Sequence, residues 1–234
     1  MIKVILWDVD NTLLDFIAAE RISLGRRFAE FGLGEYTDEI AADYSAINVR
    51  WWEMLERREK TKKEILTGRF REFLAKYGGD PDQAEAFDYA YESGLPETIV
   101  FFDGALEVLR ALKGQVLQCA VTNGTKFVQE RKLKNSGLEE LFDAVFISED
   151  VGFEKPDIRY FQHVLSAVGP CDPGEIMIVG DSLTSDIRGG DDAGIVTCWF
   201  NPKGKEAPAD LRIDYQIRAL TEVPGLLRRL NGGN

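Results

Sequence analysis

The chain has 234 residues, 44% of them hydrophobic and 29% charged, which is enough to bury one large core or two small ones. Its 28 Lys and Arg residues against 40 Asp and Glu residues give a net charge of −12, which argues against non-specific binding to nucleic acid or to anionic membrane surfaces. No apolar run approaches the roughly 20 residues that span a bilayer, and the first residues lack a secretory pattern, so we expect a cytoplasmic protein. Cys119, Cys171 and Cys198 are widely spaced and odd in number, which argues against a disulfide framework or structural zinc.

The first predicted element is a strand over residues 2–7, where an almost unbroken apolar run leads directly into Asp8 and Asp10. A strand with this pattern is buried on both faces, and ligand-binding groups gather at the carboxyl ends of such parallel strands. Two carboxylates placed there repel each other unless a cation balances them. The pattern therefore predicts a metal ion and a phosphate group beside this end of the strand.

Residues 16–93 contain no strand-like run and are predicted to form a helical insert. Thr37 is a candidate N-cap for one helix, Thr61 and Glu64 form a capping-box pattern for a second, and Asp80, followed by proline, starts a third. Because the insert directly follows the first strand, we expect it to act as a lid over the carboxyl end of that strand.

After the insert, short apolar runs alternate with helix-like segments, which is the βαβ rhythm of a mostly parallel sheet with helices on both faces. The segment 214–217 is a candidate edge strand. The predicted core strands are 116–121, 144–147, 176–179 and 196–200.

Polar groups follow the predicted strands at several loops, and each group taken alone is common by chance. An EF-hand calcium loop does not explain the first of them, because Leu13 occupies the position of the required glycine and the motif follows a strand. Together they form an ordered set. In chain order they are Asp8-Val9-Asp10-Asn11-Thr12, Thr122-Asn123-Gly124, Lys155-Pro156 and the loop 180–186 with Asp181 and Asp186.

This set resembles the haloacid dehalogenase (HAD) superfamily, specifically its phosphatase branch, over nearly the whole chain. The resemblance implies a Rossmann-like α/β core built from residues 1–15 and 94–234, with a helical cap domain at 16–93. Within that branch the motifs and the flanking stretches 147–152 and 193–199 look most like the YjjG-type pyrimidine 5'-nucleotidases.

The resemblance also implies roles for the acids. Asp8 would be the nucleophile that forms an aspartyl-phosphate, and Asp10 the general acid that later serves as the base. Mg²⁺ would be held by the carboxylates of Asp8 and Asp181 and by the Asp10 backbone carbonyl, with Asp186 acting through a bound water.

Further residues of the set are implied to bind the phosphoryl group. Thr122, the backbone amide of Asn123 and the permissive Gly124 would grip its oxygens, while Lys155 would bridge Asp8 and a phosphate oxygen. The only histidine, His163, leaves no room for a nucleophile–histidine triad with a separate imidazole, and we expect it on a helix surface.

The implied function is Mg²⁺-dependent hydrolysis of small phosphomonoesters, with pyrimidine nucleoside 5'-monophosphates as preferred substrates. Dehalogenases of the superfamily share the first aspartate but lack a second one two residues later, so Asp10 favours phosphoryl transfer. Three alternatives stay open: a sugar-phosphate phosphatase, a phosphomutase, and a metal-dependent phosphate-binding module without turnover. We expect a monomer or homodimer that binds neither nucleic acid nor membrane.

Candidate substrate contacts in the insert are Asn48 and Trp52. The neighbouring Trp51 follows the apolar spacing of the helix, which favours a place in its core. Trp52 lies about 100° further around the helix, so it cannot share all of that face. We therefore expect Trp52 to be free to meet a nucleobase.

Overall fold

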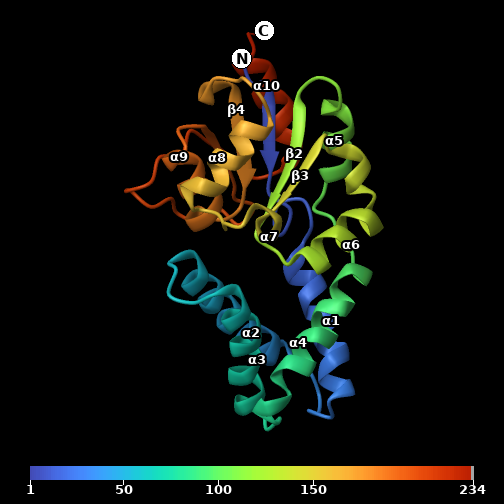
Figure 1. Cartoon of the computed structure of the whole chain (residues 1–234). Helices are drawn as coiled ribbons and strands as arrows, with labels where there is room; N and C mark the ends of the chain where they lie inside the picture. The colour runs from blue at the N-terminus through green and yellow to red at the C-terminus, as the bar shows by residue number, and fades with distance from the viewer. Residues whose placement is uncertain (233–234) are drawn as a thin grey trace. The chain divides into compact units, whose positions relative to one another are not determined.

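The computed structural model describes residues 1–232 and divides into two compact units (Figure 1). The core unit combines residues 1–15 with the chain from Val100 onward, and the helical unit is the continuous stretch Phe16–Ile99 inserted between them. The sequence placed the end of the insert at residue 93. In the structure the last helix continues into the turn Leu95–Glu97, where Leu95 is buried, so these residues belong to the helical unit.

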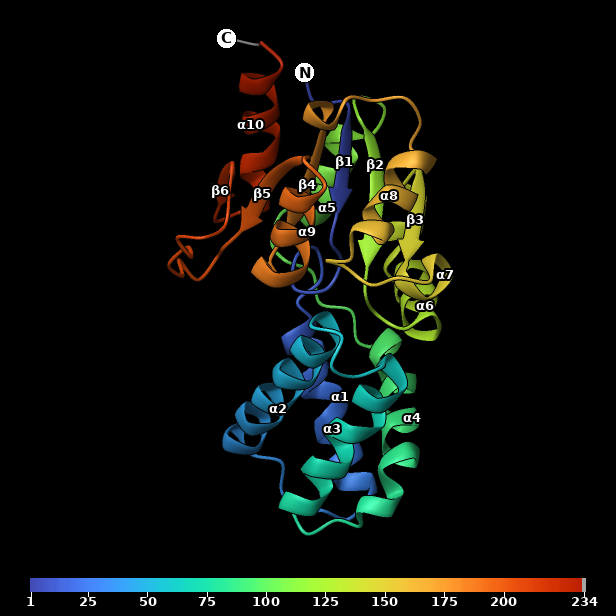
Figure 2. The ribbon, with the colours of Figure 1, turned by 60° about the vertical axis from the view of Figure 1, so that its left-hand side comes forward.

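Within residues 1–232, six parallel strands form the sheet of the core unit in the order β3-β2-β1-β4-β5-β6 (Figure 2). The chain adds strands on one side of the first strand and then returns to continue on its other side, which places the topological switch point between β1 and β4. The strands are β1 (Val4–Trp7), β2 (Leu117–Thr122), β3 (Ala144–Ile147), β4 (Ile176–Gly180), β5 (Val196–Phe200) and β6 (Tyr215–Ile217).

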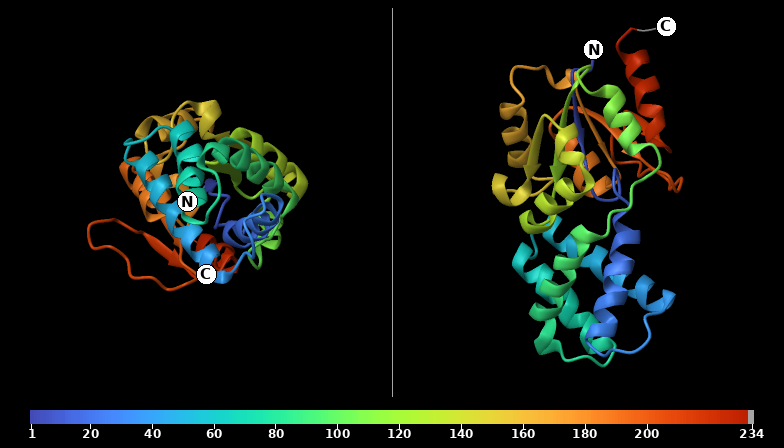
Figure 3. Two further views of the ribbon diagram at one scale, coloured as in Figure 1. Left: turned by 90° about the horizontal axis from the view of Figure 1, so that it is seen from below. Right: turned by 90° about the vertical axis from the view of Figure 1, so that its right-hand side faces the viewer.

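Helices cover both faces of the sheet. On one face α8 (Ile158–Ala167) buries Phe161 against the apolar side chains of β1, β2 and β4, and α9 (Arg188–Asp192) brings Gly190 close to Ile178. On the other face α5 (Ala105–Leu112) and α10 (Val223–Leu230) lie side by side (Figure 3). The helices α6 (Lys126–Ser136) and α7 (Ser148–Val151) follow β2 and β3.

The predicted strands are confirmed with small shifts at their ends. The first strand begins at Val4 because Ile2 instead exchanges backbone hydrogen bonds with the Asn231 side chain, at 2.6 and 3.2 Å. The candidate edge strand is β6. The described residues contain no helix that combines the length and the apolar character needed to cross a membrane.

The helical unit consists of α1 (Phe16–Glu30), α2 (Asp38–Glu56), α3 (Lys62–Lys76) and α4 (Ala84–Gly94). The predicted N-caps are confirmed: the Thr37 hydroxyl accepts from the N–H of Ile40, and Thr61 and Glu64 close a capping box. Asp80 caps a short turn that leads into α4. The helix α1 was not singled out by the sequence patterns.

A buried polar network connects every helix of this unit, and we call it the helical-unit network. The Arg69 guanidinium of α3 donates to Asn48 Oδ1 of α2 and to Asp88 Oδ1 of α4, both at 2.9 Å. Glu20 Oε1 of α1 accepts from Asn48 Nδ2 at 2.9 Å and from the Tyr91 hydroxyl at 3.2 Å. Each polar group therefore has a partner, which buried polar groups need if they are not to destabilise the fold.

The chain leaves and re-enters the core unit through two paired segments. Leu14 and Phe101 form an antiparallel bridge, the N–H of Asp15 donates to the carbonyl of Val100 at 2.8 Å, and that of Phe102 donates to Leu13 at 3.0 Å. The start and the end of the insertion are thus held side by side within the core unit.

Candidate active site

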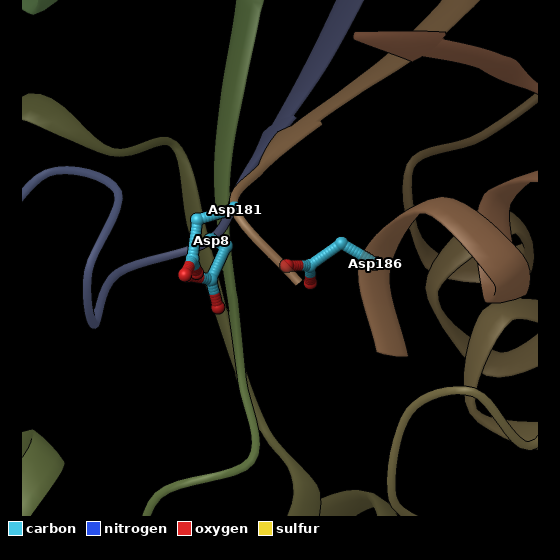
Figure 4. Close-up of side chains that lie close together, drawn as sticks. All are labelled: Asp8, Asp181 and Asp186. Carbon is cyan, nitrogen blue, oxygen red and sulfur yellow. The ribbon is translucent and has the colours of Figure 1, made fainter. Parts of the chain in front are cut away.

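The carboxyl ends of β1 and β4 bring three acids together. Asp8 follows β1, Asp181 follows β4, and Asp186 lies on a π-helical turn, Leu183–Ile187, directly after that loop. One carboxylate oxygen from each lies within 4.8 Å of the other two (Figure 4). The sequence separates Asp8 from Asp181 widely, and the parallel pairing of β1 with β4 places them side by side.

A threonine joins the loops after β1 and β4. The chain turns back sharply after Asp8, with Asn11 in the left-handed region at a φ of 63°, and this turn presents Thr12 to both loops. The Thr12 hydroxyl donates to Asp8 Oδ2 and accepts from the N–H of Asp181, each at 3.0 Å. The Trp199 indole fixes the same loop from β5 by donating to the Asp181 carbonyl at 3.0 Å. These bonds preorganise the two acids.

Asp186 depends on a glycine for its position. A Cβ atom at Gly180 would lie 2.3 Å from Asp186 Oδ2, so any larger residue there displaces the carboxylate. The N–H of Ser182 donates to the same oxygen at 3.1 Å. The loop after β4 therefore closes around Asp186 and buries it completely.

Lys155 is a buried cation at the centre of this group, with a side chain only 1% exposed. Its ammonium donates to Asp8 Oδ1 at 2.8 Å, to Asp186 Oδ1 at 2.7 Å and to the Val121 carbonyl at 2.9 Å, which uses all three of its N–H groups. The Asn123 side chain holds the Lys155 backbone through two hydrogen bonds of 2.8 Å, one in each direction. This anchoring role of the Asn123 side chain was not expected from the sequence.

The acids outnumber the cations here, and their pKa values reflect it. Burial first, and then repulsion from Asp186, raise the pKa of Asp8 to about 7, although Lys155 opposes both effects. Burial and the charges of Asp8 and Asp186 raise the pKa of Asp181 well above its usual range. Burial lowers the pKa of Lys155, but attraction to Asp186 and Asp8 outweighs it, so the pKa rises and the lysine stays charged.

This arrangement fits a divalent cation. Carboxylate oxygens are the ligands that Mg²⁺ prefers, and a 2+ charge would offset the repulsion that raises the pKa values of Asp8 and Asp181. The donor set is therefore chemically suited to Mg²⁺. Asp186 Oδ1 already accepts from the Lys155 ammonium at 2.7 Å, and its action on a metal through water stays a prediction.

The Asp10 carboxylate is bonded to two side chains of α6. Lys132 Nζ donates to Asp10 Oδ1 at 2.5 Å, and Gln129 Nε2 donates to Asp10 Oδ2 at 2.6 Å. Neither partner was predicted from the sequence. A signal for them was available, because a lysine and a glutamine three residues apart share the face of α6 that also carries buried apolar residues such as Val128.

The predicted phosphate-binding loop lies at the end of β2. Thr122 is buried, and its hydroxyl accepts from the N–H of Gly124 at 3.1 Å. A Cβ atom at Gly124 would lie 2.1 Å from Gln129 Nε2, so a larger residue there would displace that side chain. The loop thus lies against both Asn123, which anchors Lys155, and Gln129, which contacts Asp10. Its role in binding phosphate stays a prediction.

The two candidate residues in the helical unit differ. Asn48 is buried, and its amide is bonded to Glu20 and Arg69 in the helical-unit network. Its contact with a substrate stays a prediction. Trp52 is half-buried, and its contact with a nucleobase stays a prediction. Trp51 packs its ring against Gly68, as its apolar spacing favours.

The fold and this site define a class of protein: a doubly wound α/β protein with an acidic, lysine-bridged centre at its topological switch point and a helical insertion after the first strand. Residues 2–194 match the family model of haloacid dehalogenase-like hydrolases, and the chain belongs to this family. The superfamily resemblance stated from the sequence is thereby confirmed.

One similar relative is the HAD-hydrolase YfnB of Bacillus subtilis, which is 36% identical over 225 residues and covers 96% of this chain and 95% of its own length. The crystal structure of YfnB bound to magnesium superimposes with a TM-score of 0.91, covering 97% of this chain and 98% of YfnB. The two proteins therefore share their whole architecture.

Two further relatives are pyrimidine 5'-nucleotidases. YjjG of Escherichia coli is 30% identical over 223 residues, covering 95% of this chain and 96% of YjjG. PynA of Streptococcus pneumoniae is 32% identical over 225 residues, covering 94% of this chain and 93% of PynA. The chain is thus a HAD-superfamily hydrolase that is similar to pyrimidine 5'-nucleotidases along nearly its full length.

Proposed function

We propose that the protein is a Mg²⁺-dependent phosphatase that hydrolyses small phosphomonoesters through an aspartyl-phosphate, with pyrimidine nucleoside 5'-monophosphates as preferred substrates. The observation that carries the proposal is the Asp8 carboxylate, which is fixed by Lys155 on one oxygen and by Thr12 on the other while it faces two further acids. The similarity to YjjG and PynA supports the choice of substrate class.

Asp8, Asp181 and Asp186 are the residues that would hold Mg²⁺, together with the Asp10 backbone carbonyl. When bound, the ion supplies positive charge against the three carboxylates and the phosphate oxygens. The chain itself supplies Lys155, whose ammonium donates to Asp8 Oδ1 at 2.8 Å. Preorganised charge of this kind is usually the largest contribution to phosphoryl transfer.

In the first step an Asp8 carboxylate oxygen attacks phosphorus, and the bond from phosphorus to the ester oxygen breaks. Asp10 donates a proton to that departing oxygen, so the alcohol leaves neutral and the phosphoryl group remains on Asp8. In the second step Asp10 accepts a proton from a water molecule whose oxygen attacks phosphorus, which releases inorganic phosphate and restores Asp8. Thr122 and the amides of its loop would orient the phosphoryl oxygens.

The helical unit is proposed to serve as the cap that excludes water and selects the ester. Trp52 is its proposed base-contacting residue, and replacing it with alanine should then change the ranking among nucleotide substrates. An unchanged ranking would remove Trp52 from the proposal without affecting the chemistry at Asp8.

A phosphate-release assay tests the proposed activity. Purified protein is incubated with uridine and thymidine 5'-monophosphates, purine mononucleotides and sugar phosphates, each with Mg²⁺ and with a chelator. We expect release only with Mg²⁺ and fastest from the pyrimidine nucleotides. An isomerised sugar phosphate without free phosphate would instead identify a mutase, and tight binding without any turnover would identify a binding module.

A further inference from the structure

We propose that Lys132 and Gln129 of α6 are positioning residues for Asp10, and that they aim its carboxylate for proton transfer. The inference rests on the proposed function, in which Asp10 is the acid and then the base. It adds to that function a pair of residues from an element that supplies none of the superfamily motifs recognised in the sequence.

The geometry fixes both oxygens of the Asp10 carboxylate. Lys132 Nζ lies 2.5 Å from Oδ1 and Gln129 Nε2 lies 2.6 Å from Oδ2, so neither rotation of the carboxylate nor displacement of its side chain leaves both bonds intact. The two donors lie three residues apart and therefore on the same face of the helix. Proton transfer needs such control, because a misplacement of about 1 Å can cost about 100-fold in rate.

Packing alone does not explain these two side chains. Both are almost fully buried, at 2% exposure for Lys132 and 1% for Gln129, whereas the Asp10 carboxylate that they hold is 23% exposed. A buried ammonium destabilises the fold unless it is paired, and apolar side chains at these positions would continue the buried face that Val128 and Leu133 begin. The two buried polar side chains are therefore explained by their bonds to the more accessible Asp10 carboxylate.

Gln129 also carries an unsatisfied group. Among the described residues, no hydrogen-bond donor reaches its buried Oε1, while its Nε2 is committed to Asp10. A half-satisfied buried amide is unfavourable, and such departures from ordinary packing concentrate at functional sites. Because Gly124 lies directly against the same amide, Gln129 also links the position of Asp10 to the predicted phosphate-binding loop.

The test uses the dependence of the reaction on its leaving group. Lys132→Met and Gln129→Met are assayed with uridine 5'-monophosphate, whose ribose oxygen needs a proton to leave, and with p-nitrophenyl phosphate, whose phenolate does not. Lys134→Met is the matched control, because Lys134 is exposed on the same helix. The first turnover is followed by rapid mixing, and the phosphorylated protein by intact mass after acid quenching.

We expect the Lys132 and Gln129 variants to lose about 100-fold in kcat on the nucleotide, with little change in KM, while the first turnover of p-nitrophenyl phosphate is preserved. Because the second step still needs a base, the aspartyl-phosphate should then accumulate. Lys132→Arg, which keeps a donor and a charge, should recover part of the loss. The Lys134 control should behave like the unaltered protein.

Equal losses in the rate of the first turnover of the two substrates, or no loss in that rate on either, would overturn the positioning role and leave the proposed function standing. If the unaltered protein releases phosphate from neither substrate, the proposed function fails and this inference fails with it. Should Lys132→Met not fold, Gln129→Met decides the question, because it removes a neutral side chain.

Discussion

Both units of the molecule bury a cation among acids, Arg69 in the helical unit and Lys155 at the acid cluster of the core unit, and the two surroundings differ. In the helical-unit network, Arg69 is bonded to Asn48 and Asp88 and lies 4.8 Å from the Phe70 ring centroid, while Glu20 has donors of its own. In the core unit, Asp8, Asp181 and Asp186 face one another across a single buried lysine.

The difference shows how a buried charged group that holds helices together is distinguished from one that belongs to a candidate active site. Both centres are buried, so burial alone does not mark a site. In the helical unit each acid meets hydrogen-bond donors, and the result is a connection between helices. In the core unit the carboxylates repel one another, which leaves a local excess of negative charge that a divalent cation would offset.

The largest expected effect is a loss of turnover when the acid cluster of the core unit is altered. Asp8→Asn removes the proposed nucleophile, so turnover should fall by at least about 10⁴-fold, as for other enzymes that lose a covalent catalytic group. Thermal unfolding should show a folded protein, because the substitution also removes one repelling charge. Asp103→Asn, at an exposed position of the core unit, is the control and should retain full activity. Substantial turnover by Asp8→Asn would rule out the aspartyl-phosphate route.

The second expected effect is a loss of stability when the helical-unit network is broken. Arg69→Met leaves the partly buried Asp88 without its partner, so the helical unit should lose about 3 kcal/mol of stability, the lower end of the range for breaking a buried pair. Hydrogen exchange of amides in α2, α3 and α4 measures this loss locally. Arg71→Met, at an exposed position of the same helix, should change little. Adding Asp88→Asn to Arg69→Met should reduce the loss, and an unchanged loss would contradict the pairing.

The third expected effect is stabilisation by Mg²⁺, which tests whether the acid cluster is the metal site. At a Mg²⁺ concentration about 100 times Kd, a single site should stabilise the folded protein by about 2.7 kcal/mol. Asp181→Asn should abolish most of that gain, because it removes a ligand, whereas the exposed Asp192→Asn should keep it. Thermal melts with Mg²⁺ and with a chelator measure the difference. An equal gain in the two variants would place the metal elsewhere.

The smallest expected effect is on how the stability of the metal-free protein depends on pH. The pKa of Asp8 is raised from 3.8 to about 7, so between these values the folded protein binds a proton that the unfolded chain has released. Stability from this group is therefore present at low pH and is lost as pH rises towards about 7. Urea unfolding in chelator should show a fall in this range that is weaker in Asp8→Asn. A parallel fall in both proteins would contradict the raised pKa.

Much of the fold could be predicted because its signals are local. An apolar run ending in acids marks β1, and caps such as Thr37 and Thr61 are read within a few residues. Helix α1 was not predicted as a separate helix because its buried face includes Glu20 and Ser23 as well as apolar residues, which weakens the apolar periodicity. The buried partner of Glu20 comes from another helix, so no local pattern reveals it.

The site was predictable to the extent that chain order and strand ends determine it. The meeting of Asp8 with Asp181 follows from parallel strands, whose carboxyl ends share one edge of the sheet. The contacts of Asp10 with α6 join residues more than a hundred positions apart and depend on how that helix packs. The place of Asn48 in the interior depends likewise on helix rotation, which spacing alone does not fix.

The paired segments at Leu13–Asp15 and Val100–Phe102 have a consequence for modularity. Paired strands lie about 4.7–4.9 Å apart, so the two ends of the insertion are as close as the two strands of a hairpin. For the core unit, the whole insertion therefore takes the place of a hairpin loop. Closing a loop costs little more as the loop lengthens, and the pairing is made by residues of the core itself. The same two-stranded base can therefore carry an insertion of another length or fold without rebuilding the sheet of the core unit.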